Sequence, residues 1–359
     1  MLNKPGWPQS LERWSAFWNG RLADRPPVIA HFSDTDELDV GPEQTLEGEI
    51  AHFDAGRNGE QLERIEQSVL EHTAFEDDTP PAILAGGGVY YTGAVFGAPL
   101  RATARMMACE PIIDDWSATP SVRYDHSNEW VQRSLNLAHQ LVDRSGGQYA
   151  VIPGLLEGPS DICANLRGPT RLASDLYEYP EQVQRLAATG AAAWEAHARS
   201  HFDIVPLLDG GSATQWSLWT PGRGAALQED FCTIISPRQY REIFLPLDRE
   251  LARVADVTWM HIHAGAIHLI EEVLSADEIQ GIQIVYDGQV SPPLSTTIPL
   301  MQSVQARGRC LILRKYSPAD LFHILPHLSP RRLAVDAYFT NPTEARDWLG
   351  RLERWEFTQ

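Results

Sequence analysis

The chain has 359 residues, and 29 lysine and arginine residues against 48 aspartate and glutamate residues give it a net charge of −19 at pH 7. This acidic balance argues against nucleic acid or an anionic membrane surface as the main partner. The length suits a single α/β barrel domain over residues 1–359, and a hydrophobic content of 43% is enough for one large core.

The N-terminal segment, residues 1–8, has no charged stretch followed by an apolar one, so we expect no secretory signal peptide. No apolar run approaches the ~20 residues that a membrane-spanning helix needs. The cysteines Cys109, Cys163, Cys232 and Cys310 are widely spaced and predict reduced thiols rather than a disulfide framework. The sequence therefore predicts a cytoplasmic protein without a membrane partner.

Short β-branched runs alternate with helical patterns along the chain. Most of these runs are continuously apolar, as expected of parallel strands that are covered on both faces. The predicted strands span residues 28–32, 82–87, 149–156, 203–210, 257–264, 281–287, 310–316 and 333–339. The predicted helices span residues 127–144, 179–202, 236–255, 266–275, 295–307, 319–327 and 342–356. Helix starts are marked by a capping residue followed by proline at Ser236, Ser317 and Asn341.

Eight strand–helix units with right-handed crossovers predict a single (β/α)8 TIM barrel. An open doubly wound sheet is the alternative, but residues 86–88 are consecutive glycines and do not form its dinucleotide-binding fingerprint. The long connections at residues 33–81 and 88–148, after the first and second strands, are expected to form loops over the mouth of the barrel.

Active sites of such barrels lie at the C-terminal ends of the strands. The fifth predicted strand ends in His261 and His263, which are two residues apart and therefore project to the same side. Packing and ordinary hydrogen bonds would explain a lone histidine. Two on one face indicate either a metal site or an acid and base that titrate near neutral pH.

A metal at these histidines needs one or two further ligands, which carboxylates can supply. For Glu229 and Asp230 the alternative is an acidic pair favoured by the dipole of a following helix. Two histidines and one carboxylate suit zinc or iron, so we expect a divalent metal, with zinc as the first candidate. The predicted catalytic residues are His261, His263, Asp230 and Asp287, and the predicted metal ligands are His261, His263, Asp336 and Glu229.

Aromatic and basic residues near the strand ends are candidates for substrate binding. Two tryptophans in a loop over the mouth suggest stacking on a flat or apolar ligand, with anchoring of the loop as the alternative. The arginines are candidate clamps for a carboxylate or phosphate, with structural ion pairs as the alternative. The predicted substrate-binding residues are Trp216, Trp219, Arg223, Arg167, Tyr286 and Tyr338.

Several segments spread over nearly the whole chain form a recognisable set of motifs. They are residues 228–231 (QEDF), 235–237 (ISP), 244–246 (FLP), 158–168 (GPSDICANLRG), 259–265 (WMHIHAG) with 282–283 (IQ), 17–27 and 96–98. Together they resemble the uroporphyrinogen decarboxylase-like superfamily. The resemblance implies a (β/α)8 barrel. The superfamily includes tetrapyrrole decarboxylases and zinc-dependent methyltransferases that work with methylcorrinoid proteins and coenzyme M.

The chain departs from both groups in its motifs. The decarboxylases carry an arginine-rich RQAGRY segment near the N-terminus, whereas the matching residues 27–32 contain no arginine, so uroporphyrinogen decarboxylation is not expected. The methyltransferases hold zinc with an H-x-C motif and a distant cysteine. Here the motif reads His261 and His263, and residues 335–338 contain no cysteine. A set of N and O ligands suits the activation of water or an oxygen substrate rather than a thiol.

The leading prediction is a metal-assisted, methyltransferase-like enzyme that acts on a small aromatic or apolar-bodied substrate at the barrel mouth. The alternatives are a metal-free decarboxylase or lyase, and a non-catalytic barrel that binds a ligand or a corrinoid protein. The resemblance implies a corrinoid on a partner protein as methyl carrier. The sequence is compatible with a homodimer and does not determine the oligomeric state.

Overall fold

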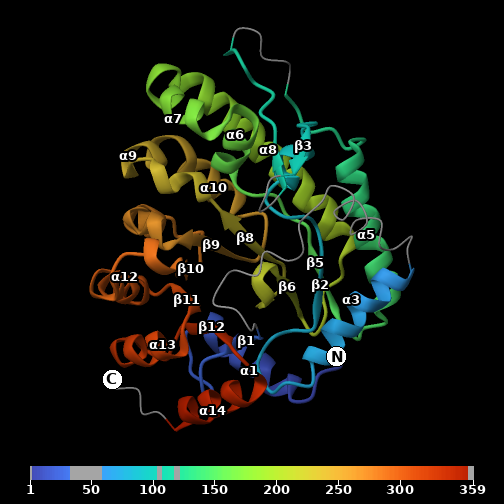
Figure 1. The fold of residues 1–359 in the computed structure, drawn as a ribbon, viewed down its shortest axis with the longest axis vertical. Coiled ribbons are helices and arrows are strands. Elements are labelled where there is room, and N and C mark those ends of the chain that lie inside the picture. The colour runs from blue at the N-terminus through green and yellow to red at the C-terminus, as the bar shows by residue number, and fades with distance from the viewer. Residues whose placement is uncertain (1, 33–58, 103–106, 117–121, 355–359) are drawn as a thin grey trace.

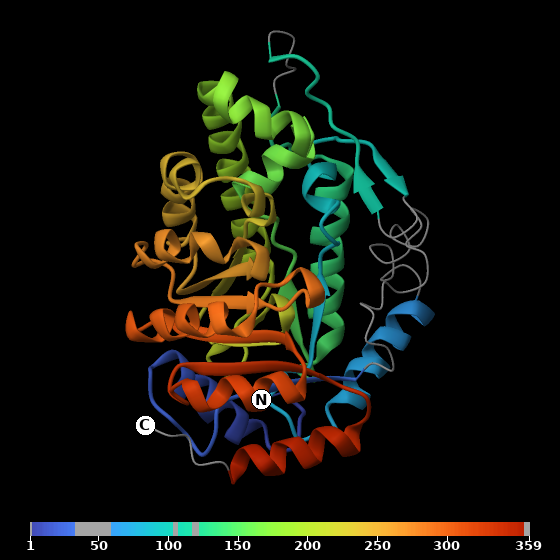
Figure 2. The same cartoon turned by 60° about the vertical axis from the view of Figure 1, so that its left-hand side comes forward.

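The computed structural model describes residues 2–32, 59–102, 107–116 and 122–354, which form an α/β protein with helices outside a set of parallel strands (Figures 1 and 2). Six strands make one curved parallel sheet in the order β1-β12-β11-β10-β9-β8. They are β1 (Val28–Phe32), β8 (Gly224–Gln228), β9 (Val257–His263), β10 (Gly281–Val285), β11 (Cys310–Tyr316) and β12 (Leu333–Phe339).

The other described strands form three separate pairs. These are the parallel pair β2 (Ala82–Ala85) and β5 (Ala150–Pro153), the hairpin β6 (Gly211–Thr214) and β7 (Leu218–Pro221), and the antiparallel pair β3 (Leu100–Ala102) and β4 (Met107–Cys109). The helices are α1 (Trp7–Trp18), α3 (Gly59–His72), α4 (Tyr91–Ala94), α5 (Glu129–Ser145), α6 (Pro159–Arg167), α7 (Pro169–Glu178), α8 (Pro180–Ile204), α9 (Pro237–Gln239), α10 (Leu245–Leu251), α11 (Ile270–Leu274), α12 (Leu294–Ala306), α13 (Pro318–Ile324) and α14 (Pro342–Glu353). A π-helical segment, Tyr240–Phe244, joins α9 to α10.

The strand predicted at residues 203–210 is wrong. Helix α8 runs on to Ile204, and Leu208 and Gly211 then close a tight turn by exchanging backbone hydrogen bonds. The strand that pairs with β9 is β8, which the sequence analysis did not identify. The reason is compositional: β8 begins Gly224-Ala225-Ala226, and these small residues have low strand propensity in isolation.

The hairpin β6–β7 lies inside the curved sheet, between β5 and β8, and contacts both (Figure 1). Its residues Ala213, Leu218 and Trp219 share a buried apolar cluster with inward-facing strand residues such as Ile29 and Trp259. Small residues make room for it. A side chain on Gly224, for example, would collide with Thr214 and Thr220 of the hairpin. The hairpin therefore fills the lower part of the interior.

In the described part of the chain, no backbone ladder joins β1 to β2, so the closed eight-stranded barrel is not shown. Two backbone N–H groups on this edge of β1 donate to carboxylates instead of to a strand. Val28 N donates to Asp78 Oδ2 and Ala30 N donates to Asp77 Oδ2, each at 2.9 Å. A cavity of about 190 Å³ lies at this seam, with Ala30 and Ala82 in its lining. The observed architecture is a six-stranded half-barrel accompanied by the β2–β5 pair.

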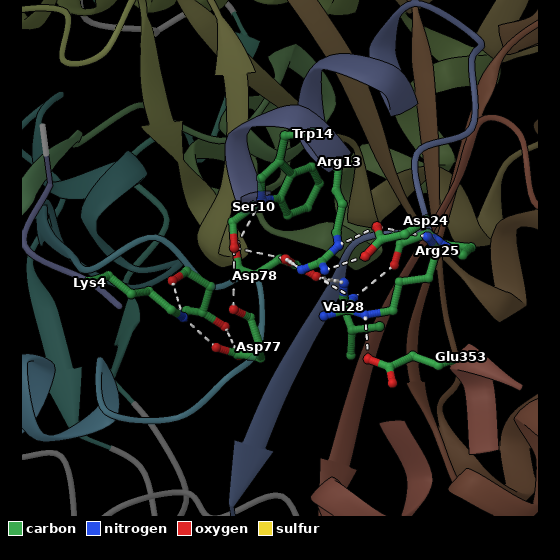
Figure 3. A network of polar contacts seen from close by, with 12 residues as sticks. Lys4, Ser10, Arg13, Trp14, Asp24, Arg25, Val28, Asp77, Asp78 and Glu353 are labelled. Atoms are coloured by element: carbon green, nitrogen blue, oxygen red, sulfur yellow. Dashed lines mark hydrogen bonds and ion pairs between the residues drawn. The ribbon is translucent and has the colours of Figure 1, made fainter. Parts of the chain in front are cut away.

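The carboxylate of Asp78 connects helix α1 to strand β1 (Figure 3). Its buried carboxylate accepts hydrogen bonds from Ser10 Oγ, Arg13 Nη1 and Arg25 Nη1 as well as from Val28 N. These groups belong to α1, to the segment before β1 and to β1 itself. One carboxylate thus fixes the first helix against the first strand.

The predicted helix starts are confirmed at all three capping residues. Ser236 forms a capping box with Gln239, Ser317 Oγ accepts from Asp320 N, and Asn341 Oδ1 accepts from Thr343 N and Glu344 N. All four cysteines are free thiols. Among the described helices, none combines the length and the apolar character required to traverse a lipid bilayer.

Candidate functional site

His261 and His263 lie together at the C-terminal end of β9, with ring centroids 5.1 Å apart. The predicted pairing of the two imidazoles on one face therefore holds. His261 Nδ1 lies 2.6 Å from Gln283 Oε1, and His263 Nδ1 lies 2.8 Å from Asp287 Oδ1. Each acceptor fixes the ring orientation and favours a proton on Nδ1, which leaves Nε2 with its lone pair free to bind.

Asp230 faces the two imidazoles from the loop after β8. Its Oδ2 accepts from Gln228 Nε2 at 2.6 Å, and its Oδ1 lies 3.6 Å from His263 Nε2. Oδ1 is buried and has no hydrogen-bond partner within the described residues. The ligand atoms of His261, His263 and Asp230 lie within 4.8 Å of one another, a separation that one metal ion can span.

The ionisation of these groups follows from burial and from their charged neighbours. Burial lowers the pKa of His261 well below its usual value, so this ring stays neutral and ready to coordinate. The hydrogen bond to Asp287 and the charge of Asp230 raise the pKa of His263. Burial raises the pKa of Asp230, and the positive charge of His263 only partly opposes this. Protons therefore compete with a cation for His263 at acid pH.

The tip of the inner hairpin supports the site from below. Trp216 stacks on His261 with centroids 4.1 Å apart and planes at 7°, and it has a left-handed backbone with φ of 56°. A non-glycine residue held in this conformation is strained, and its surroundings must stabilise it. Trp216 lies in the turn of the inner hairpin, one face of its indole is covered by the imidazole of His261, and its predicted contact with a substrate stays a prediction.

A second cluster of polar side chains comes from β1, β11 and β12 and faces the interior. His31 Nε2 lies 2.9 Å from Asp336 Oδ1, Arg314 Nη1 pairs with Asp336 Oδ2, and Arg314 Nη2 donates to Tyr338 Oη at 3.2 Å. Burial opposes ionisation of Asp336, but Arg314 and His31 outweigh it and hold its pKa below the usual value. The metal-ligand role predicted for Asp336 is therefore corrected: its carboxylate neutralises Arg314.

Buried carboxylates lie behind Asp230. Asp161 accepts from Asp230 N at 2.8 Å and from Phe231 N at 2.7 Å, and so fixes the loop that carries Asp230. Glu157 is buried nearby, and the ligand oxygens of Glu157, Asp161 and Asp230 lie within 4.8 Å of one another. Burial, reinforced by mutual repulsion, raises the pKa of both Glu157 and Asp161 well above their usual values.

Glu229 belongs to this acidic region rather than to the metal triangle, which corrects its predicted role as a ligand. Its Oε2 accepts from Ser160 N at 2.9 Å, and burial together with the charge of Asp248 raises its pKa well above the usual value. Asp248 accepts from Tyr240 Oη at 2.6 Å, and burial raises its pKa to about 6. Burial therefore favours the protonated form of both carboxyl groups.

This arrangement predicts that Asp248→Asn stabilises the protein above pH 6. A carboxyl whose folded pKa is raised adds stability that is present below about pH 4 and is lost as the pH rises through 6. Asparagine can still accept from Tyr240 and carries no charge, so the expected gain at pH 8 is about 2–3 kcal/mol. Urea unfolding at pH 4 and pH 8 measures it. The exposed Glu181→Gln serves as control, and equal pH dependence in wild type and Asp248→Asn would contradict the expectation.

Four other predicted site residues make contacts with side chains or backbone within the protein. Trp219 is buried in the lower hairpin core, and Arg223 donates to Val205 O and packs over Phe202. Arg167 pairs with Asp175 at 2.6 Å and donates to backbone oxygens, while Tyr286 stacks on Tyr316. These are structural contacts, so the substrate-binding roles predicted for Trp219, Arg223, Arg167 and Tyr286 are corrected. Tyr338 remains at the mouth, stacked on His31.

The sequence analysis missed the residues that support the triangle. Gln283 and Gln228 are polar residues on inward-facing positions of otherwise apolar strands, and this was a usable signal. Asp161 lies in the first turn of α6, and its carboxylate binds the loop after β8. His197 and His201 of α8 bind the backbone of Gly154 and thereby fix the loop that carries Glu157.

The chain is similar to the solved structure of a methyltransferase from Methanosarcina mazei, with a TM-score of 0.64 and 13% sequence identity over 96% of this chain and 98% of the other. Comparison with known protein families and with curated proteins found no match. At this identity the likeness concerns the fold alone, so the chain is an α/β protein whose fold resembles that of a methyltransferase.

Proposed function

We propose that this protein is a metal-assisted enzyme that transfers a methyl group to an oxygen atom of a small substrate at the C-terminal strand ends. The observation that carries the proposal is the triangle of His261, His263 and Asp230, whose ligand atoms lie within 4.8 Å of one another while Gln283 and Asp287 hold the Nδ1 atoms of the two imidazoles. Supporting carboxylates and amides behind metal-binding histidines are the usual arrangement in metalloenzymes.

The residues present fit a divalent cation. Asp230 Oδ1 is a buried oxygen without a hydrogen-bond partner among the described residues, which is the environment that a bound cation would satisfy. Two nitrogens and one oxygen suit zinc, and they leave room for a further ligand. When bound, such an ion supplies Lewis-acid polarisation of a substrate oxygen.

The protein groups around the triangle bind and orient the substrate in this proposal. Trp216 blocks the interior below His261 and so confines the substrate to the mouth. Tyr338 and His31 form a stacked aromatic wall on the opposite strands, which suits a flat or apolar substrate body. Because Arg314 is already paired with Asp336, we assign it to the wall rather than to the capture of a substrate carboxylate.

The family assignment and the barrel are part of the same proposal. The similarity to a methyltransferase and the motif resemblance together support a (β/α)8 barrel of the uroporphyrinogen decarboxylase-like kind, in which the β2–β5 pair completes the ring. The motif resemblance alone favours a methylcorrinoid on a partner protein as the methyl donor. A decarboxylase of the uroporphyrinogen type would need several arginine side chains to bind substrate carboxylates, whereas Arg314 is already paired with Asp336.

The test is zinc-dependent methyl transfer from methylcobalamin to phenol, with 2-mercaptoethanesulfonate as the thiol comparison. We expect loss of methylcobalamin absorbance and formation of anisole only with the zinc-loaded protein, and no reaction with the His263→Ala variant. Equal rates with and without zinc, or methylation of the thiol alone, would contradict the proposal.

A further inference from the structure

Lysine is rare in this chain, and both lysines occupy specific sites. Among its 29 lysine and arginine residues, only Lys4 and Lys315 are lysines. Lys4 is buried in an ion pair with Asp77 at 2.5 Å. Lys315 lies at the C-terminal end of β11, beside the candidate site. Because arginine occupies nearly every other basic position, lysine at 315 points to a property that arginine lacks, namely an amine that can lose its proton.

Lys315 lies in a β-bulge at the C-terminal end of β11. Arg314 pairs with Asp336 and Tyr316 pairs with Ala337, so Lys315 is an extra residue without a partner position on β12. Arg314 faces inward to Asp336, whereas Tyr316 joins the outer apolar core. Lys315 has φ of 63°, a left-handed conformation that is costly for a lysine. Bulges beside active sites commonly re-aim a side chain in this way.

The ammonium group of Lys315 is held near the site without being neutralised. In the part of the chain that the structure describes, its Nζ makes no hydrogen bond or ion pair. Burial and the charge of Arg314 lower the pKa of Lys315, and the two nearby carboxylates only partly oppose this. The charged or titratable groups that act on Lys315 are His261 and His263 of β9, Asp287 after β10, Arg314 of β11 and Asp336 of β12.

We propose that Lys315 is a catalytic amine of this site, whose Nζ accepts the proton of the substrate hydroxyl group during methyl transfer. The inference rests on the proposed function and names its proton acceptor. His263 cannot fill this role while its Nδ1 is bonded to Asp287 and its Nε2 serves the triangle. Among the described residues beside the triangle, Lys315 combines a removable proton, half-burial and a nitrogen without a hydrogen-bond partner.

The step balances in atoms and charge. The lone pair of neutral Lys315 takes the proton, the substrate O–H bond breaks, and an N–H bond forms. The substrate oxygen forms a bond to the methyl carbon of an electrophilic methyl donor, whose own bond to that carbon breaks with the electron pair leaving on the donor. The ammonium then returns its proton to solvent. Burial lowers the cost of keeping the amine neutral before the reaction.

The scarcity of lysine makes the test direct. Reductive methylation with 13C-formaldehyde labels only Lys4, Lys315 and the N-terminal amine, and the Lys315→Arg variant identifies the Lys315 signal by its loss. In the metal-free protein we expect the Lys315 signal to titrate below a dimethyl-lysine peptide reference. Zinc content and melting temperature of Lys315→Arg should match wild type. Its kcat in the phenol assay should fall by about 10²–10⁴-fold, with little change in KM.

The outcomes separate this inference from the proposed function. A Lys315 signal that titrates at or above the reference, or full turnover by Lys315→Arg, overturns the role of Lys315. Failure of the wild-type protein to bind zinc overturns the metal site instead, and the titration of Lys315 in metal-free protein remains readable. A lowered Lys315 titration with a loss of kcat in Lys315→Arg supports the inference.

Discussion

Replacing His263 with alanine is expected to abolish stoichiometric zinc binding. The variant removes one of three ligand atoms that lie within 4.8 Å of one another and leaves only His261 and Asp230. The loss should exceed the roughly 10–100-fold cost of removing a group that merely supports a ligand. Elemental analysis after dialysis and titration with a zinc-competing chelator measure it. Binding in the wild type should weaken as the pH falls through the raised pKa of His263, because protonated imidazole cannot coordinate.

Two further variants calibrate this result. Asp287→Ala removes the acceptor of the His263 Nδ1 proton. This variant should lower the affinity for zinc by about 10–100-fold without abolishing zinc binding. His139→Ala changes an exposed histidine of α5 and should have no effect. If His263→Ala and His139→Ala both keep the zinc content of the wild type, the triangle is not a metal site.

Replacing Asp78 with alanine is expected to be the most destabilising single change at the lower end of the molecule. Its carboxylate is fully buried and binds Arg13, Arg25, Ser10 and the backbone of Val28 (Figure 3). Removal leaves the buried guanidinium of Arg25 without its main counter-charge, which costs about 3–5 kcal/mol. Urea unfolding at neutral pH, followed by fluorescence of the tryptophans in α1, measures the loss.

Asp24→Ala provides the matched control. Asp24 pairs with the same Arg13, at 2.6 Å, but its side chain is 60% exposed. An exposed ion pair contributes about 0–1 kcal/mol, so this variant should remain close to wild type. Equal destabilisation by Asp24→Ala and Asp78→Ala would mean that the burial of Asp78 does not determine its importance.

The strand-end rule located the most important residues from sequence. His261 and His263 alternate on β9, and the two-residue period of a strand is enough to place them on one face. Asp230 was also proposed, although the strand before it had been placed wrongly at residues 203–210. The rule worked because any strand that ends just before Asp230 delivers it to the same edge of the sheet.

The residues assigned incorrectly depend on contacts between distant segments. The sequence predicts a metal ligand at Asp336, whereas its ion pair with Arg314 follows from the register of β11 against β12. Trp219 was assigned to the mouth because nothing local shows that its hairpin folds into the interior. The bulge at Lys315 has no sequence signal either, since it arises from a register shift between two strands. The periodicity of a strand predicts the face on which a side chain lies. It does not predict which residue of another segment contacts that side chain.

The most direct test of the central claim is a crystal structure of the zinc-soaked protein with anomalous diffraction data at the zinc edge. We predict one peak about 2.0–2.2 Å from an imidazole nitrogen of His261, an imidazole nitrogen of His263 and a carboxylate oxygen of Asp230. The Nδ1 atoms of both histidines should keep their bonds to Gln283 and Asp287. An empty triangle, with zinc absent or bound at other groups, would contradict the account.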